Sequence, residues 1–336
     1  MKIKNRVVSN LQIKNIIIQK EGKIENMESK RLNQIDEQLL GEVSNLENIT
    51  KGAYNIRKNG KGVERQVTEN VNIVTKKDVS GIDIYVKENT KFEFIHIPVI
   101  ITESGLKDLV YNDFHIGKNA NVIIVAGCGI HNDHHKDSEH DGIHRFYLEE
   151  GAKVRYIEKH YGEGNGDGKR ILNPVTEVYL KAGSSLEMES VQIKGVTSTI
   201  RETKGVLEKD TNFVVTEKIM TDGKQYAKTI FDVQLNGENS STHVTSRSVA
   251  TENSKQEFIS KIYGNEKCFA HSECDAIIRD NAIVTATPEI TANNVEANLI
   301  HEAAIGKIAG EQLTKLMTLG LSEKEAEEEI INGFLR

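Results

Sequence analysis

The chain has 336 residues, of which 38% are hydrophobic and 28% are charged, a balance typical of a folded globular protein with a sizeable core. Its formal net charge is −7 and its Lys and Arg residues form no block, which argues against nucleic acid as a partner because phosphate recognition needs clustered basic side chains. No apolar run reaches the ~18 residues that a membrane-spanning helix needs, and the first residues lack a signal-peptide pattern, so we expect no membrane partner.

Residues 1–75 are expected to form an N-terminal segment of helical and mixed structure. Its best helical pattern lies in ESKRLNQIDEQLLGEV, residues 28–43, where leucines and an isoleucine recur at helical spacing and Gly41 can end the helix. The next stretch, residues 52–76, has the composition of loops and short strands.

From residue 76 to residue 300 one pattern returns: a turn with Gly or Asn, a small residue, then alternating apolar residues. The copies are 27 to 32 residues apart, and no helical pattern separates them. This period predicts a mostly β protein with a parallel β-helix core over residues 76–300, whose stacked coils bury a face that no single coil could bury. An antiparallel β-sandwich is the competing fold, although its hairpin signals are few. The strands of successive copies begin at Phe92, Val122, Val154, Leu186, Phe213 and His243.

Residues 301–336 are expected to form a C-terminal helical segment. An apolar stripe between Ile308 and Met317 predicts one helix, and Gly320 ends it. Ser322 and Glu325 form a capping box for a second helix. A hairpin this short cannot bury both apolar stripes by itself, so it must pack on the β-helix or offer a surface to a partner.

The stretch GCGIHNDHHKDSEHDGIH, residues 127–144, holds one cysteine and five histidines, a mixture that suits soft or borderline metal ions. We count His131 and His144 as candidate metal ligands, and we place Cys128 and His144 where the loop meets a strand. His134, His135 and His140 are expected to be solvated loop residues. A β-solenoid metalloenzyme that uses this stretch is an alternative function, although the HExxH pattern of zinc proteases is missing.

Strand alternation in KVRYIEKHY, residues 153–161, places Val154, Tyr156, Glu158 and His160 on one face. That face begins apolar, so we expect it to point into the coil. A buried carboxylate there needs a partner or a metal ion. The alternative is that the strand ends at Ile157 and that both polar residues lie in the following loop.

Three cysteines, Cys128, Cys268 and Cys274, are spaced like neither a disulfide framework nor a zinc-binding pair. They indicate a cytoplasmic protein whose thiols stay free for metal or sulfur chemistry, unless all three are merely small buried residues. Cys268 and Cys274 share one face of an expected strand, and His301 and Glu302 follow at the junction with the helical segment. A thiol, an imidazole and a carboxylate are therefore expected at one end of the β-helix.

ECDAII, VEANLIHEAAIGKI and EQLTKLMTLGLSEKEAEEEIINGF, all beyond residue 272, resemble the C-terminal half of the SufB/SufD family of the SUF system, which assembles iron–sulfur clusters. GAYNIRKNG and the histidine-rich stretch resemble its short SufB-like members. The resemblance implies a non-enzymatic scaffold with a parallel β-helix, and an ABC-type ATPase, SufC, docked on residues 301–336. It also implies a sulfur donor, apo-protein acceptors, and pairing into a homodimer or with a SufD-like chain.

By position, the resemblance implies that Cys274 holds a nascent, transient iron–sulfur cluster, that Glu302 is the acidic ligand beside it, and that His301 is their neighbour. Thiolate and carboxylate ligands suit iron, and a twofold dimer would complete the ligand set. A structural SufD-like subunit without its own cluster is the alternative. Cys128, Glu158 and His160 fall on the implied sulfur path, with Cys128 as the thiol that receives sulfur.

Overall fold

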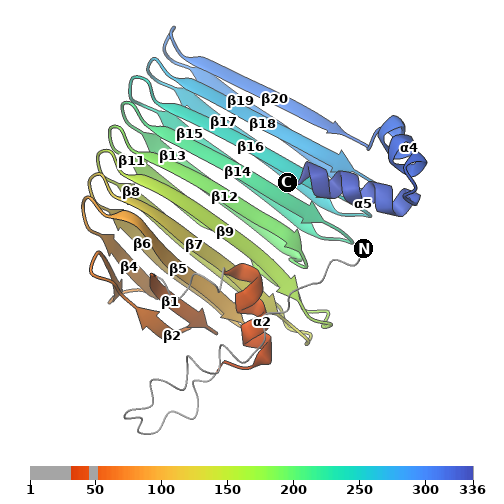
Figure 1. The fold of residues 1–336 in the computed structure, drawn as a ribbon, viewed down its shortest axis with the longest axis horizontal. Helices are drawn as coiled ribbons and strands as arrows, with labels where there is room; N and C mark the ends of the chain where they lie inside the picture. The colour runs from red at the N-terminus through yellow and green to blue at the C-terminus, as the bar shows by residue number, and fades with distance from the viewer. Residues whose placement is uncertain (1–31, 45–51, 336) are drawn as a thin grey trace. The chain divides into compact units, whose positions relative to one another are not determined.

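The strands alternate between two facing sheets of mainly parallel strands, so that successive coils stack into the β-helix that the repeat predicts (Figure 1). The computed structural model describes residues 32–44 and 52–335. Sheet A contains, in spatial order, β2 (Lys61–Gln66), β1 (Ala53–Lys58), β5 (Lys91–Ile101), β7 (Asn121–His131), β9 (Lys153–Glu163), β12 (Ser185–Lys194), β14 (Asn212–Thr221), β16 (Ser241–Ala250), β18 (Phe269–Ile278) and β20 (Asn298–Gly306). Sheet B contains β19 (Ile283–Ala292), β17 (Lys255–Gly264), β15 (Tyr226–Leu235), β13 (Ser198–Leu207), β10 (Arg170–Leu172) with β11 (Val175–Leu180), β8 (Ser138–Leu148), β6 (Lys107–Ile116), β4 (Gly81–Val86) and β3 (Val71–Thr75).

The apolar ladder between the sheets follows the predicted repeat for its central copies. Val122, Val154, Leu186 and Phe213 align in parallel register and are buried. The two outer positions were predicted wrongly by one residue. Thr242 aligns with Phe213 in place of His243. Phe92 lies in a bulge with a φ of 52°, so its side chain is 73% exposed and Glu93 aligns with Val122.

The strands extend past the predicted core limits of 76 and 300 at both ends. β1 pairs in parallel with β5, and β20 runs to Gly306. At the N-terminal end β2 and β3 pair antiparallel with their neighbours. At the C-terminal end β19 and β20 each have a partner on one side only among the described strands. The last coil therefore presents two free sheet edges, which are templates for further pairing.

Helix α2 (Gln34–Val43) covers the outer face of sheet A over β5, β7 and β9. The helix continues past Gly41 to Val43, so the prediction that Gly41 ends it was wrong. Gly41 is exposed, and its cost of about 1 kcal/mol relative to Ala is offset by burial of Val43. A Cβ atom on Gly127 would lie 2.5 Å from the Val43 carbonyl oxygen, so glycine is what lets the helix lie this close.

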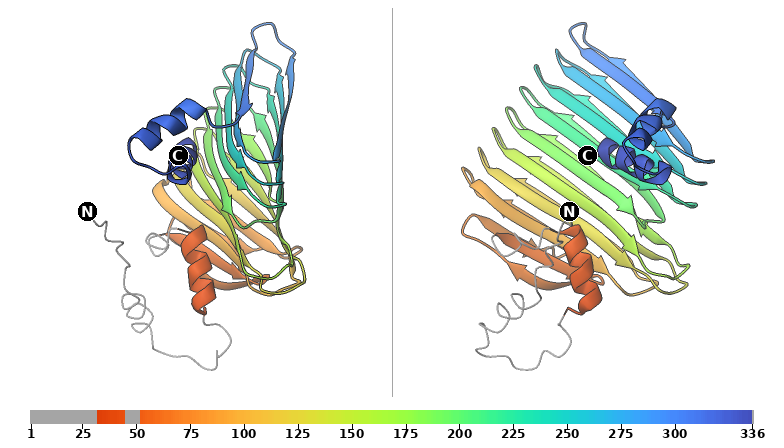
Figure 2. Two further views of the ribbon diagram at one scale, coloured as in Figure 1. Left: turned by 90° about the vertical axis from the view of Figure 1, so that its right-hand side faces the viewer. Right: turned by 45° about the vertical axis from the view of Figure 1, so that its right-hand side comes forward.

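The C-terminal hairpin consists of α4 (Gly310–Thr318) and α5 (Glu323–Phe334). The capping box of Ser322 and Glu325 is confirmed. Helix α5 packs Ile331 and Leu335 against Val249 on the outer face of sheet A, the same sheet that α2 covers (Figure 2). Helix α4 has no buried residue. No helix in the described part of the chain is long and apolar enough to cross a membrane.

Candidate functional site

A cavity of about 20 Å³ lies between the sheets beside Cys128, enough for a water molecule. Its polar lining comes from β7, β8 and β9: the Cys128 thiol, His140, His144, Glu158 and His160. Alternation along β9 puts Glu158 and His160 inside, as predicted, because the strand does not end at Ile157 but continues to Glu163. Burial, with Asp108 and Glu158 nearby, raises the pKa of the Cys128 thiol well above its ordinary value.

Glu158 is the centre of a buried hydrogen-bond network. Arg201 donates to one carboxylate oxygen, and the Tyr156 hydroxyl donates to the other over 3.0 Å. That hydroxyl in turn lies 2.7 Å from Nδ1 of His144. Burial alone would raise the pKa of Glu158, but the Arg201 guanidinium and the neighbouring histidines hold it well below its ordinary value. The group is therefore an ionised carboxylate with a buried cation as its counterpart.

A second set of polar groups continues this network toward Cys274. Arg201 Nε lies 3.6 Å from a carboxylate oxygen of Glu217. Glu217 accepts hydrogen bonds from Thr229 and Ser246, over 2.8 and 2.9 Å. Ser246 and Cys274 are register partners on adjacent strands. A continuous line of buried polar side chains thus runs inside the β-helix from the Cys128 cavity to Cys274.

Cys274 faces the interior and is 1% exposed, and burial raises the pKa of its thiol to about 12. Cys268 is also buried on this face, as predicted. Two polar atoms near Cys274 have no hydrogen-bond partner among the described residues: the Ser272 hydroxyl and Nδ1 of His301. Ser272 and His301 are register partners on β18 and β20, so both lie on the interior side of the last coils.

Glu302 lies on the other face of the same sheet. It is the register partner of Glu273, whereas Cys274 aligns with Ala303. Its side chain is 66% exposed and lies 3.6 Å from Nε2 of His271. The structure therefore brings Cys274, His301 and Glu302 to one end of the β-helix, as expected. The thiol and the carboxylate nevertheless point to opposite faces.

The histidine-rich stretch is divided between strands and a loop. His134 and His135 are exposed, as predicted, but His140 lies on β8, is 6% exposed and faces Asp108 over 3.2 Å, so its prediction as a solvated residue was wrong. His131 lies between Glu163 and Asp133, with its two ring nitrogens 3.0 and 2.9 Å from their carboxylates. His144 also has a polar partner for each ring nitrogen. The metal-ligand roles of His131 and His144 stay predictions.

Sequence reasoning missed Arg201, Glu217 and Ser246. Each is a polar residue at an inward position of its strand. The alternation of apolar residues along that strand could have predicted that the side chain points inward. What was lacking is the register that aligns Glu217 with Ser246 and the facing of the two sheets that brings Arg201, on β13, to Glu158 and Glu217.

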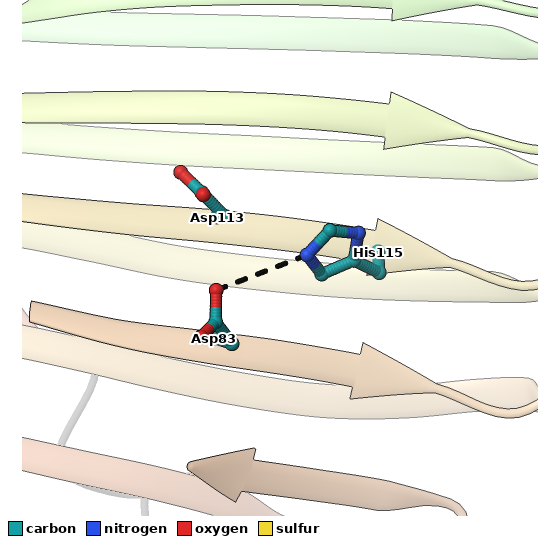
Figure 3. Close-up of side chains that lie close together, drawn as sticks. All are labelled: Asp83, Asp113 and His115. Atoms are coloured by element: carbon teal, nitrogen blue, oxygen red, sulfur yellow. Dashed lines mark ion pairs between the residues drawn. The ribbon is translucent and has the colours of Figure 1, made fainter. Parts of the chain in front are cut away.

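Sequence reasoning also missed a group on the outer face of sheet B, where ligand atoms of Asp83, Asp113 and His115 lie within 4.8 Å of one another (Figure 3). Lys76 forms ion pairs with both carboxylates, with its Nζ 2.7 Å from Asp113. The Lys76 ammonium therefore already occupies the position that a metal ion would take between them.

Comparison with known proteins identifies one family of relatives. Residues 114–334 match the family model described as "SUF system FeS cluster assembly, SufBD core domain". The chain is 29% identical to an iron-sulfur cluster assembly SufBD family protein of Methanocaldococcus jannaschii over 85% of this chain and 90% of the relative. A SufBD family protein of Pyrococcus horikoshii is 28% identical over 75% of this chain and 77% of the relative.

A further match is confined to a shorter region. The iron-sulfur cluster assembly protein SufB of Bacillus subtilis is 34% identical over 103 residues, which is 29% of this chain and 22% of the relative. The family model, by contrast, covers well over half of the chain. The chain belongs to the SufBD family of iron–sulfur cluster assembly proteins.

Proposed function

We propose that the chain is a scaffold on which an iron–sulfur cluster is built, with sulfur received at Cys128 and the nascent cluster held at Cys274. The observation that carries the proposal is the buried polar line between the two cysteines, through Glu158, Arg201 and Glu217. A solely structural subunit has no need of such a line, because unpaired or charged buried groups cost stability.

Arg201 gives that line its positive charge. Arg201 is 5% exposed, and its guanidinium lies between the carboxylates of Glu217 and Glu158, of which that of Glu158 is ionised. Burial raises the pKa of Glu217, against the lowering effect of Arg201 and of the hydrogen bonds from Thr229 and Ser246. A sulfur species carried past these groups is anionic when deprotonated, and a buried guanidinium stabilises an anion in a medium of low dielectric constant. Nδ1 of His160 lies 3.2 Å from the Arg201 guanidinium, so His160 belongs to the same buried polar line.

For the cluster itself we propose Cys274 and Glu302 as ligands, with His301 beside them. Their side chains meet only if β20 moves, and β20 is free to do so because it is paired on one side. The free edges of β19 and β20 are the surface we propose for pairing with a second copy of the chain, or with a SufD-like chain. Either partner supplies the further ligands that two residues cannot provide.

An ABC-type ATPase of the SufC kind is the partner that we propose for residues 301–336. Helix α5 is anchored on sheet A, whereas α4 leaves Met317 and Leu319 exposed at 44% and 75%. A short segment joins β20 to α4, so a nucleotide-driven movement of a partner bound to α4 would be transmitted to β20. A sulfur donor and apo-protein acceptors complete the set, in a reducing cytoplasm.

The test is anaerobic reconstitution of the chain co-purified with its ATPase, using iron and sulfide and recording visible absorption. Cys274→Ser should lose the cluster while still binding the ATPase, and Cys268→Ser, a buried thiol off the polar line, should keep it. Deletion of residues 308–336 should abolish ATPase binding. Full cluster retention by Cys274→Ser would refute the assignment.

A further inference from the structure

One polar group of the Cys128 cavity has no role in the proposed function: the imidazole of His140, on β8. Its Nδ1 lies 3.2 Å from Oδ2 of Asp108. Arg57 donates to both oxygens of that carboxylate, over 2.6 and 2.9 Å. Burial alone would raise the pKa of the Asp108 carboxyl, but the hydrogen bonds from Arg57 and His140 hold it well below its ordinary value. Asp108 is therefore an ionised carboxylate.

The contact with Asp108 determines which nitrogen of His140 carries a proton. An ionised carboxylate can only accept hydrogen bonds, so Nδ1 of His140 must donate to it. In a neutral imidazole the other nitrogen, Nε2, then has a free lone pair. No described residue forms a hydrogen bond with this Nε2. A Cβ on Gly142 would lie 3.3 Å from it, so the glycine leaves space open beside the lone pair.

His160, the second histidine of the cavity, already uses its lone pair. The Arg201 guanidinium can only donate hydrogen bonds and lies 3.2 Å from Nδ1 of His160, so this nitrogen is the acceptor. Nε2 of His160 then carries the proton and lies 3.6 Å from Oε1 of Glu158. The ring of His160 cannot accept a further proton without losing its contact with Arg201.

His144, the third histidine of the cavity, is also fully engaged. Burial lowers its pKa to about 4, so the ring is neutral at pH 7. The Tyr156 hydroxyl donates to the ionised Glu158 carboxylate and therefore accepts from Nδ1 of His144. Nε2 of His144 is then the acceptor for Asn112, over 3.4 Å. Among the three cavity histidines, only His140 keeps a lone pair that can take a proton.

The geometry of the coil places the Cys128 thiol across from His140. β7 and β8 are the two strands of one coil, and their inward side chains meet between the sheets. The hydrogen bond of His144 to Tyr156, the register partner of Ile124, puts His144 across from the position of Ile124. Four residues nearer the turn on each strand, Cys128 lies across from His140, and both line the cavity.

We propose that His140 is the base that takes the proton of the Cys128 thiol, and that Asp108 and Arg57 are positioning residues that hold its tautomer. The Asp108 carboxylate also stabilises the imidazolium that forms. A base is needed because burial raises the pKa of the thiol, so that very little thiolate exists at neutral pH.

The part of His140 in sulfur transfer rests on the proposed function. There the Cys128 thiolate attacks the outer sulfur of a donor persulfide, R–S–SH. A bond forms between Sγ of Cys128 and that sulfur, and the S–S bond of the donor breaks. The donor leaves as a thiolate, R–S⁻, and takes up the proton from His140, so the step needs no oxidant or reductant. The cavity gives the added sulfur atom space beside Cys128.

The charged groups around this pair come from four further strands. Asp108 on β6 and Glu158 on β9 are negative, Arg57 on β1 and Arg201 on β13 are positive, and the two other cavity histidines are described above. Both carboxylates disfavour a thiolate at the cysteine. Neutralising Asp108 would therefore ease ionisation of the thiol if Asp108 were only a nearby charge. Loss of its support for the imidazole would instead hinder ionisation, so the two roles predict opposite signs.

The test is the rate at which iodoacetamide alkylates Cys128 in the folded full chain between pH 7 and pH 9, followed by peptide mass mapping. The parent's rate should change little over this range, because His140 takes the proton in place of hydroxide. His140→Gln should lower the rate at pH 7 by at least about 10-fold, and its rate should rise about 10-fold per pH unit. Asp108→Asn should also lower the rate at pH 7 by at least about 10-fold. His96→Gln, at a fully buried histidine outside the cavity, is the matched control and should keep the parent's rate.

An unchanged rate in His140→Gln, or a faster rate in Asp108→Asn, would overturn the assignment. So would a parent in which Cys128 is not alkylated at all while the chain is folded. Thermal melts show whether each variant is folded. Gly142→Ala leaves both reacting groups in place but fills the space beside Nε2, so it should also slow alkylation, and an unchanged rate there would count equally against the base. Cluster retention is not measured, so this assignment and the scaffold proposal can fail separately.

Discussion

Cys274 and Glu302 lie on neighbouring strands, yet their side chains point to opposite faces of sheet A. A β-strand that shifts by one residue against its neighbour turns every side chain to the other face. β20 can shift more readily than any strand between two others, because β18 is its only hydrogen-bonded strand partner in the described part of the chain. The structure thus keeps the buried Cys274 thiol apart from the exposed Glu302 carboxylate. A shift of β20 by one residue against β18 would put both side chains on the same face.

Thiol reactivity tests whether Cys274 is closed off at rest. The thiolate is the reactive form, and with a pKa of about 12 very little of it exists at neutral pH. We expect slow alkylation of Cys274 by iodoacetamide in the free chain and rapid alkylation after denaturation. Peptide mass mapping gives the rate for each cysteine. Fast native alkylation would show that the last coil is already open.

The same assay with the co-purified ATPase tests the proposed movement. Addition of ATP should increase the alkylation rate of Cys274 while leaving that of Cys128 unchanged, since Cys128 lies deep among complete coils. Equal rates with and without ATP at Cys274 would argue against nucleotide-driven opening of β20.

Replacing Arg201 tests the buried charge pair. Arg201→Met leaves Glu158 as an unpaired buried carboxylate, and we expect a loss of about 3–5 kcal/mol in the free energy of unfolding. Adding Glu158→Gln removes that charge and should restore part of the loss. Urea denaturation measures Arg201→Met, Glu158→Gln and the double variant. For contrast, Lys181→Met breaks a half-exposed ion pair with Glu149 and should cost less than about 1 kcal/mol.

An additive result in that cycle would contradict the pairing. If the double variant lost the sum of the two single effects, Arg201 and Glu158 would contribute independently, and the polar line would be interrupted at its centre.

The fold could be predicted from the sequence because each copy of its repeat has a local pattern, a turn followed by alternating apolar residues. Alternation assigns a face to each strand residue, as it did for Glu158 and His160, and the capping box of Ser322 marks a helix start. The candidate site depends on the register between strands of neighbouring coils, and the alternation within a single strand does not specify that register. The bulge at Phe92 shifts register by one residue, and the same one-residue difference separates Glu302 from the face of Cys274.

The pH dependence of stability should report on His96. This side chain is fully buried, neither ring nitrogen has a hydrogen-bond partner among the described residues, and burial lowers its pKa from 6.5 to about 4. Below pH 6.5 the unfolded chain binds a proton at this residue while the folded chain does not. Stability is therefore lost as the pH falls from 6.5 to about 4, by at most about 3 kcal/mol.

Substitution isolates that contribution. His96→Phe should flatten the decline in unfolding free energy between pH 7 and pH 5, as measured by urea denaturation at each pH. His134→Gln, at an exposed loop position, should keep the parent's slope. An unchanged slope in His96→Phe would mean that another group carries the effect.

The close approach of α2 to β7 can be tested with one methyl group. A Cβ on Gly127 would lie 2.5 Å from the Val43 carbonyl oxygen and 2.7 Å from that of Lys159, so backbone must shift to admit it. Overpacking of this kind costs about 1–3 kcal/mol, and we expect Gly127→Ala to lower the unfolding free energy by that amount and to speed amide hydrogen exchange in α2. Gly62→Ala is the matched control, because nothing lies within 4 Å of its Cβ position. If exchange in α2 matched the parent in both variants, the helix would not depend on contact with the strand that carries Cys128.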